Sequence, residues 1–183
     1  MKIAFITGLS DWGNNSLSVE QTIFLNKINT HENNKIYYNF PYINNAYVLK
    51  HTNILIASLS NALQYFLSRT KWLDKKTKIL KEIIHNNDKI LLLSGSCGLE
   101  LLSNMNFSKE EKNKIHIIAY GAVARKIPDF QYLTLVQSTK DWIARMWIHV
   151  YDLKIQGHHM NYLESKEFLN FVNSYVEKME CEN

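Results

Sequence analysis

The chain is poor in cysteine, proline and glycine, and each shortage excludes a class of protein. Its 183 residues include two cysteines, two prolines and six glycines. Cys97 and Cys181 are too few for a disulfide scaffold, lack the paired spacing of a zinc site, and suit a reducing compartment. The low proline and glycine content excludes collagen-like and low-complexity chains.

Long apolar runs are also missing. No stretch of about 18 uninterrupted apolar residues occurs, as a membrane-spanning helix would need. The first eight residues, Met1–Gly8, carry one basic residue and too short an apolar run for a secretory signal. We therefore expect a soluble, cytoplasmic protein with no membrane partner.

A strong charge of one sign is absent as well. Lysine and arginine exceed aspartate and glutamate by 21 − 17 = 4, without the clustered basic stripe of a nucleic-acid binder. A basic run from Arg69 to Lys81, with Trp72 inside it, is more typical of a solvated helix face than of a nucleic-acid or carrier contact. We expect no nucleic-acid partner.

The residues that are abundant predict a single folded domain. Hydrophobic residues make up 46% and charged residues 21% of the chain, both near globular averages. The length suits one domain with its own core, and no linker or repeat divides it, so residues 1–183 are expected to form one unit.

Six short apolar segments predict the strands of a mostly parallel sheet. Several are nearly continuous, as in Ile90–Leu93, which is typical of strands covered on both faces. Glycines such as Gly8, Gly95, Gly121 and Gly157 stand close to the ends of segments. The predicted strands are Lys2–Thr7, Lys35–Phe40, Lys89–Ser94, Ile115–Tyr120, Tyr132–Gln137 and Val150–Ile155.

Helical patterns fill most of the gaps between these strands. We expect helices over Thr22–Ile28 after a Ser18 cap, over much of Ser58–Ile84, over Gly98–Ser103, and from Ser165 to about Met179. Alternating strands and helices predict an open α/β sheet with right-handed crossovers. In such sheets, sites lie at the carboxyl ends of the strands.

The turn after the third predicted strand has the pattern of a nucleophile elbow. Ser96 is flanked at two residues on each side by the small Ser94 and Gly98, which a sharp strand–turn–helix junction needs. Cys97 is the competing nucleophile, but centring the elbow on it would put Leu99 where a small residue is required. The alternative is an ordinary glycine-rich turn that binds an anion such as a cofactor phosphate.

A serine nucleophile needs a histidine base and a carboxylate, and both follow later strands. Asp141 lies in the loop after the fifth strand, and His158 and His159 lie after the sixth. The interval from Asp141 to His159 is short, 159 − 141 = 18 positions. Asp152 is the weaker candidate for the acid because it falls within the last predicted strand.

From Met1 to about Met179 the sequence resembles the α/β-hydrolase superfamily. The resemblance rests on the first strand ending Ile6–Leu9, the elbow Ser94–Gly98, the acid turn Gln137–Asp141, the histidine loop before a final helix, and the order Ser, Asp, His. It implies six parallel strands in the order 2-1-3-4-5-6 with helices on both faces. Gly121–Gln131 leaves no room for a cap domain.

The resemblance also assigns roles. Ser96 matches the nucleophile and Asp141 the acid, while His159 is favoured over His158 as the base by its spacing to the final helix. The backbone amides of Leu9 and Cys97 match the oxyanion hole, although Thr7 replaces the family histidine. Trp12 and Trp142, which follow the oxyanion segment and the acid, are candidates for an acyl pocket.

The implied activity is hydrolysis of a small-molecule ester or thioester, free or carrier-bound, through an acyl-enzyme and without a cofactor. Acyl transfer by the same residues, a non-catalytic binding protein and a phosphate-cradling cofactor binder stay open. We expect no metal site, because His149, Asp152, His158 and His159 straddle a strand whose side chains alternate between faces. Oligomeric state and substrate identity are left open.

Overall fold

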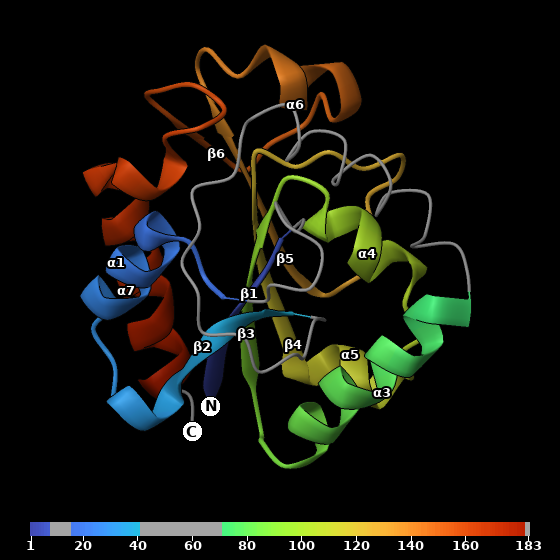
Figure 1. The fold of residues 1–183 in the computed structure, drawn as a ribbon. Coiled ribbons are helices and arrows are strands. Elements are labelled where there is room, and N and C mark those ends of the chain that lie inside the picture. Colours follow the sequence, from blue (N-terminus) through green and yellow to red (C-terminus); the bar gives the residue numbers. More distant parts are fainter. Residues whose placement is uncertain (8–15, 41–70, 182–183) are drawn as a thin grey trace.

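The computed structural model describes residues 1–7, 16–40 and 71–181 (Figure 1). Its centre is a sheet of strands β1 (Lys2–Ile6), β2 (Lys35–Phe40), β3 (Ile90–Gly95), β4 (Ile115–Tyr120), β5 (Tyr132–Ser138) and β6 (Leu153–Ile155). The strands run parallel in the order β2-β1-β3-β4-β5-β6. This confirms the predicted α/β class, the parallel pairing and the order.

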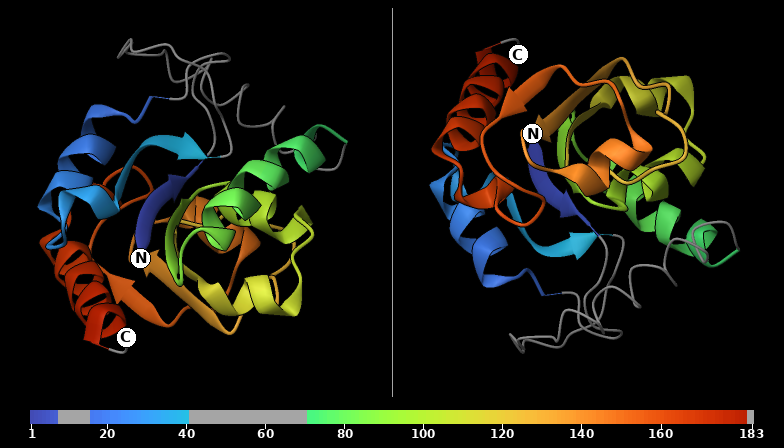
Figure 2. Two further views of the ribbon diagram at one scale, coloured as in Figure 1. Left: turned by 90° about the horizontal axis from the view of Figure 1, so that it is seen from below. Right: turned by 90° about the horizontal axis from the view of Figure 1, so that it is seen from above.

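Helices cover both faces of the sheet (Figure 2). Helices α1 (Val19–Lys27) and α7 (Lys166–Cys181) lie on one face, and α3 (Lys71–His85), α4 (Gly98–Asn104) and α5 (Lys109–Lys114) lie on the other. The short helix α6 (Trp142–Trp147) connects β5 to β6, and two 3₁₀ turns occur at η1 (Glu32–Asn34) and η2 (Tyr162–Glu164). Two buried clusters, one under each helical layer, form the core.

The strand register aligns the carboxyl ends of neighbouring strands. Ile6 is paired with Ser94, Gly95 with Tyr120, and Ser138 with Ile155. Because aligned parallel strands deliver their following turns to one edge, the segments after β3, β4, β5 and β6 meet there. This edge carries the predicted site.

Serine caps fix two helix starts. Ser18 accepts from the Gln21 amide while the Gln21 side chain accepts from the Ser18 amide, so α1 begins at Val19 as the Ser18 cap predicted. Ser108 and Glu111 form the same reciprocal pair at the start of α5, a helix that is not among the predicted ones. The Ser-x-x-Glu spacing was the available signal.

Two element boundaries differ from their predictions. The last strand was predicted over Val150–Ile155 but begins at Leu153, because Asp152 already uses its amide and its carboxylate to bond the Leu135 backbone. The helix predicted over Ser58–Ile84 is described from Lys71 to His85, and its earlier part lies outside the described residues. Of the described helices, none has the length and apolar character needed to cross a bilayer.

Candidate active site

Ser96 occupies a strained turn between β3 and α4. Its φ of 51° makes it the one non-glycine residue with a left-handed backbone among those described. Such a conformation costs a residue with a Cβ roughly 1–2 kcal/mol. The Ser96 amide donates to the Tyr120 carbonyl at 3.4 Å, and its carbonyl accepts from the Val123 amide at 2.9 Å. The turn is therefore held by the segment that follows β4.

The small residues around Ser96 are required by packing. A Cβ placed on Gly98 would overlap the Ile6 carbonyl oxygen and lie 2.8 Å from the Ser94 hydroxyl oxygen. Ser94 is fully buried, whereas Ser96 is partly exposed. Strand and helix backbones thus approach closely while the Ser96 side chain stays accessible, as a nucleophile elbow demands.

Cys97 has the opposite environment. Its side chain is buried, and burial raises the pKa of the thiol to about 12. Since the thiolate is the nucleophilic form, this environment disfavours Cys97 as the attacking group. The residue instead stands at the N-cap position of α4, with its backbone next to Ser96.

Asp141 and His159 form a close pair. The His159 Nδ1 atom lies 2.9 Å from Oδ2 and 3.0 Å from Oδ1 of Asp141, whose side chain is fully buried. Burial acts to raise the pKa of Asp141, but hydrogen bonds from His159, the Ala144 amide and Tyr162 outweigh it and hold the pKa below its ordinary value. Asp141 is therefore an ionised carboxylate that orients the imidazole.

The two loops meet because the β5–β6 ladder continues past the strands. The Thr139 amide donates to the Ile155 carbonyl, and the Lys140 amide donates to the Gly157 carbonyl, both at 2.9 Å. Gly157 has a φ of 136°, and a Cβ there would lie 2.5 Å from the Asn161 carboxamide oxygen. That oxygen accepts from the His158 amide, so the turn that presents His159 is closed by Asn161.

Tyr162 is a site residue that the sequence pattern did not indicate. Its buried hydroxyl donates to Asp141 Oδ2 at 2.7 Å and accepts from the Ser138 amide at 2.8 Å. Burial and the neighbouring Asp141 carboxylate raise the pKa of Tyr162. Tyr162 therefore fixes the acid to the end of β5. Its place three residues after His159 was visible in the sequence, but its partners were not.

The segment after β4 connects Ser96 to the acid. Gly121 follows Tyr120 with a φ of 55°, and a Cβ there would lie 2.9 Å from the Tyr162 ring and 3.2 Å from Asp141 Oδ2. The hydrogen bonds of Ser96 to Tyr120 and Val123 bracket this glycine. Ser96, Asp141 and His159 thus belong to one edge of the sheet. Within the described residues, no hydrogen bond joins the Ser96 hydroxyl to His159.

An ion pair between the buried Glu100 and the partly exposed Arg125 ties α4, the helix after Ser96, to the segment after β4. Glu100 on α4 is fully buried and accepts from the Arg125 amide at 3.0 Å, from Arg125 Nε at 2.9 Å and from Asn104 at 3.1 Å. Arg125 Nη2 lies 2.8 Å from the same carboxylate. Burial opposes ionisation, yet the bonds from Arg125 and Asn104 hold the pKa of Glu100 below its ordinary value.

The other described residues that the sequence suggested for the site do not join the Asp141–His159 pair. His158 is exposed, and its Nδ1 accepts from the Met160 amide. Asp152 bonds the β5 backbone. Across residues 1–7, 16–40 and 71–181, no three His, Cys, Asp or Glu side chains are grouped to hold a metal. Trp142 is exposed beside Asp141, whereas Leu9 and Trp12 lie outside the described residues.

Thr7, directly after β1, is held by hydrogen bonds with the side chains of Asn39 and Gln21. Its amide donates to the Asn39 carboxamide oxygen at 2.9 Å, and its carbonyl accepts from the Asn39 amide nitrogen at 3.2 Å. The Thr7 hydroxyl accepts from Gln21 at 3.2 Å. Asn39 at the end of β2 therefore fixes the backbone that leads into the predicted oxyanion segment.

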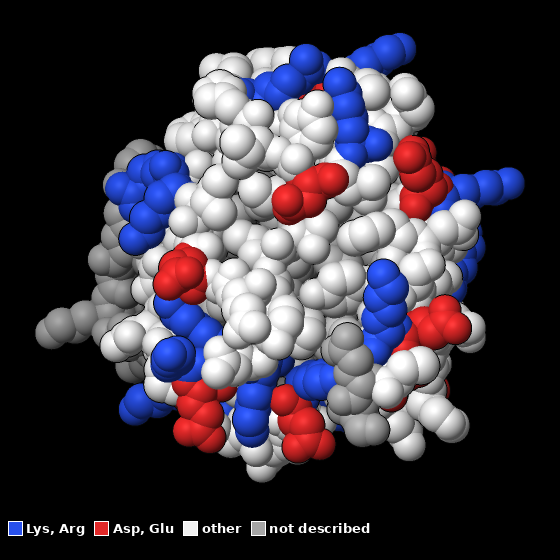
Figure 3. All heavy atoms as spheres, turned by 180° about the vertical axis from the view of Figure 1, so that it is seen from behind, with Lys and Arg blue, Asp and Glu red and all other residues white. Residues whose placement is uncertain are grey.

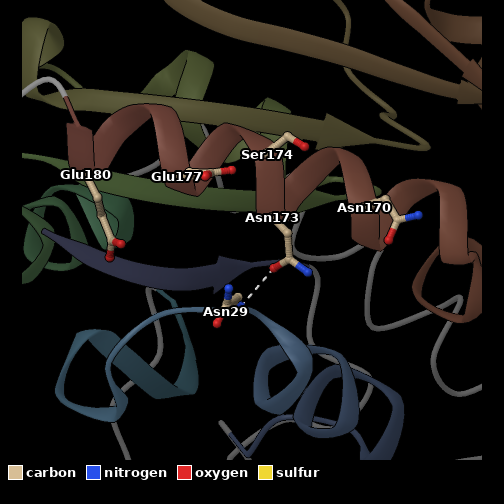
Figure 4. A pocket seen from close by; sticks show the side chains of 6 residues that line it. All are labelled: Asn29, Asn170, Asn173, Ser174, Glu177 and Glu180. Carbon is tan, nitrogen blue, oxygen red and sulfur yellow. Dashed lines mark hydrogen bonds between the residues drawn. The ribbon is translucent and has the colours of Figure 1, made fainter.

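A polar cavity of about 320 Å³ lies beside α7 (Figure 4). It separates α7 from the end of α1, where Asn173 accepts a hydrogen bond from the Asn29 amide at 2.8 Å. Glu177 and Glu180 also line it. It contains none of the predicted site residues.

Comparison with known proteins supports the fold. A crystal structure described as a predicted CIB-like hydrolase from Thermoplasma acidophilum, at 1.45 Å resolution, superposes with a TM-score of 0.52. The match covers 97% of this chain and 86% of that chain at 15% sequence identity. Neither a protein-family model nor a curated protein sequence matches the chain. At this identity the likeness shows a shared fold and no more.

Proposed function

We propose that this protein is a serine hydrolase that cleaves an ester or thioester through an acyl-enzyme. The observation that carries the proposal is the buried, ionised Asp141 holding His159 through Nδ1, at the edge where Ser96 sits in its strained turn. This arrangement leaves Nε2 of His159 as the atom that can take a proton from a serine hydroxyl.

In the proposed first step, His159 removes the Ser96 proton as the hydroxyl oxygen attacks the substrate carbonyl carbon. Asp141 stabilises the imidazolium that forms. The Cys97 amide, next to Ser96 at the start of α4, and the Leu9 amide are proposed to hold the oxyanion. One such donor contributes about 3–4 kcal/mol in comparable enzymes.

To complete acylation, His159 donates this proton to the leaving alcohol or thiol as the bond to the carbonyl carbon breaks. In the second half of the reaction, a water molecule deprotonated by the same imidazole attacks the acyl-serine carbonyl, and His159 returns that proton to the Ser96 oxygen as the acid is released. The fixed turn at Gly157 and the hydrogen bond from Tyr162 to Asp141 keep base and acid aligned through both halves. The substrate is proposed to be a small-molecule acyl ester or thioester.

Intact mass after treatment with a fluorophosphonate tests this proposal. Such probes react with activated serines, so the wild type is expected to gain one adduct. Ser96→Ala and His159→Ala are expected to gain none. Cys97→Ala and His158→Ala are the matched controls and are expected to be labelled, because neither side chain contacts Asp141 in the described structure.

Three outcomes would overturn the assignment. A folded wild type without an adduct would favour a non-catalytic binding protein on this fold. Loss of labelling in Cys97→Ala alone would identify Cys97, and not Ser96, as the nucleophile. Loss of labelling in His158→Ala, with labelling retained in His159→Ala, would identify His158 as the base.

A further inference from the structure

Large apolar side chains are exposed next to the candidate site. Trp142 directly follows Asp141 and is 66% exposed, and Met160 directly follows His159 and is 69% exposed. Met146, one turn after Trp142 on α6, is also 69% exposed. Val150 and Tyr151, which lead into β6, are exposed too. We call these five side chains, Trp142, Met146, Val150, Tyr151 and Met160, the apolar patch.

Exposure of this kind is unusual for a folded domain. Single exposed apolar residues are common, but several large ones within one stretch of chain, on α6 and in the segments on either side of β6, are candidates for an interaction surface. Figure 3 views the molecule from the β6 side, where a broad area of the surface carries no charged side chain. Lysine and arginine side chains lie along the upper part of this face in that view.

The charges beside the apolar patch are mostly positive. Between residues 140 and 160 the exposed ions are Lys140, Arg145 and Lys154 against the single carboxylate of Asp152. The Arg145 guanidinium is fixed by bonds to the Thr139 and Asp141 carbonyls, at 2.7 and 3.3 Å. Lys154 Nζ lies 5.7 Å from the centre of the Tyr151 ring. A partner that is both apolar and anionic complements this surface.

We propose that the apolar patch docks the protein on an anionic lipid surface, from which the site takes long-chain acyl esters. Tryptophan, tyrosine and methionine enter the boundary between headgroups and acyl chains, while flanking lysine and arginine pair with anionic headgroups. Since the patch begins at the neighbours of Asp141 and His159, docking would bring an ester to the candidate site. The substrate class rests on the proposed function, but the docking itself does not.

A lipid surface fits the observations better than a folded protein partner. The exposed side chains project from a six-residue helix and from loops. A fluid surface accepts projecting side chains without matching pockets, whereas a protein partner needs close shape complementarity. The expectation of no membrane partner was based on the lack of long apolar runs. That lack concerns spanning helices and does not extend to side chains that lie on a surface.

Vesicle sedimentation with the inactive Ser96→Ala protein tests the docking apart from catalysis. We expect binding to phosphatidylcholine vesicles that contain 30% phosphatidylglycerol, and about tenfold weaker binding after Trp142→Ser with Met146→Ser. The matched control is Val19→Ser with Ile23→Ser on α1, an exposed apolar pair at the same spacing, which should bind like the parent protein. Circular dichroism verifies the fold of each variant.

A second pair of variants tests the charges. Lys140→Gln with Lys154→Gln should weaken binding several-fold at low salt, while Lys27→Gln with Lys178→Gln should not. Failure to bind these vesicles, or equal binding by the patch variant, would overturn the proposal, as would equal binding to vesicles without phosphatidylglycerol. A dimer that only the patch variant dissociates, with no vesicle binding, would assign the patch to a second copy of the chain. If fluorophosphonate labelling fails while vesicle binding succeeds, the hydrolase proposal falls and the docking stands.

Discussion

Replacing Tyr162 with phenylalanine removes one oxygen that serves two buried partners. That hydroxyl donates to the Asp141 carboxylate and accepts from the Ser138 amide. A hydrogen bond to a charged group contributes about 1.5–3 kcal/mol, and an orphaned buried amide costs about 1–3 kcal/mol. We expect the free energy of unfolding at pH 7 to fall by about 2–4 kcal/mol, a large share of the roughly 5–15 kcal/mol of a typical domain.

The loss should depend on pH. The pKa of Asp141 in the folded protein lies below its ordinary value of 3.8, so its contribution to stability is present above that value and is lost as the pH falls through the folded pKa. Without the Tyr162 donor the folded pKa rises, and part of this contribution disappears. The difference between wild type and variant should therefore be largest at neutral pH and shrink in acid, leaving the pH-independent cost of the Ser138 amide.

Urea unfolding at pH 7 and at about pH 2.5 measures both parts. Tyr120→Phe is the matched control, because its buried hydroxyl lies beside the Gln21 side chain rather than a carboxylate. Its effect should not change with pH over this range. A Tyr162→Phe loss below about 0.5 kcal/mol at pH 7, or the same loss at both pH values, would refute the reasoning.

Two further substitutions test the frame around Ser96. Gly98→Ala should destabilise the protein by about 3 kcal/mol and lower its melting temperature by about 6–12 °C, since the added Cβ would overlap the Ile6 carbonyl oxygen. An unchanged melting curve would contradict the close packing of α4 against β1. Glu100→Gln should cost about 2 kcal/mol at pH 7 in urea unfolding, below the usual value for a buried pair because Arg125 is partly exposed. Because the pKa of Glu100 is lowered, this cost should diminish as the pH falls below 4.5. The control Glu110→Gln, at an exposed position, should change the free energy of unfolding little. Equal Glu100→Gln costs at pH 7 and pH 3 would count against an ionised Glu100.

The sheet could be predicted because its signals are local. Continuous apolar runs such as Ile90–Leu93 and Ile117–Ala119 are typical of strands covered on both faces of a parallel sheet, and the structure has them there. The start of β6 could not be located in this way. Val150 and Tyr151 look like strand residues, but the bonds of Asp152 to Leu135 decide where pairing begins.

The candidate site was predictable in its residue types and only partly in its contacts. Ser96, Asp141 and the two histidines follow strand ends, which the sequence shows. Adjacent histidines have nearly the same spacing, so only the turn closed by Asn161 shows that His159 meets Asp141 while His158 faces its own loop. Tyr162 and Arg125 contact partners 21 and 25 residues away, and no local pattern encodes such contacts.

The strand that presents His159 is the shortest in the sheet as described. β6 has three residues, pairs on one side only, and begins where a single aspartate side chain bonds its neighbour. Edge segments with few ladder bonds open more readily than the strands inside a sheet. His159 therefore follows an edge strand, whereas Asp141 follows the interior strand β5 and Ser96 follows the central β3. We expect the segment that carries His159 to open at a lower free-energy cost than the turn that carries Ser96.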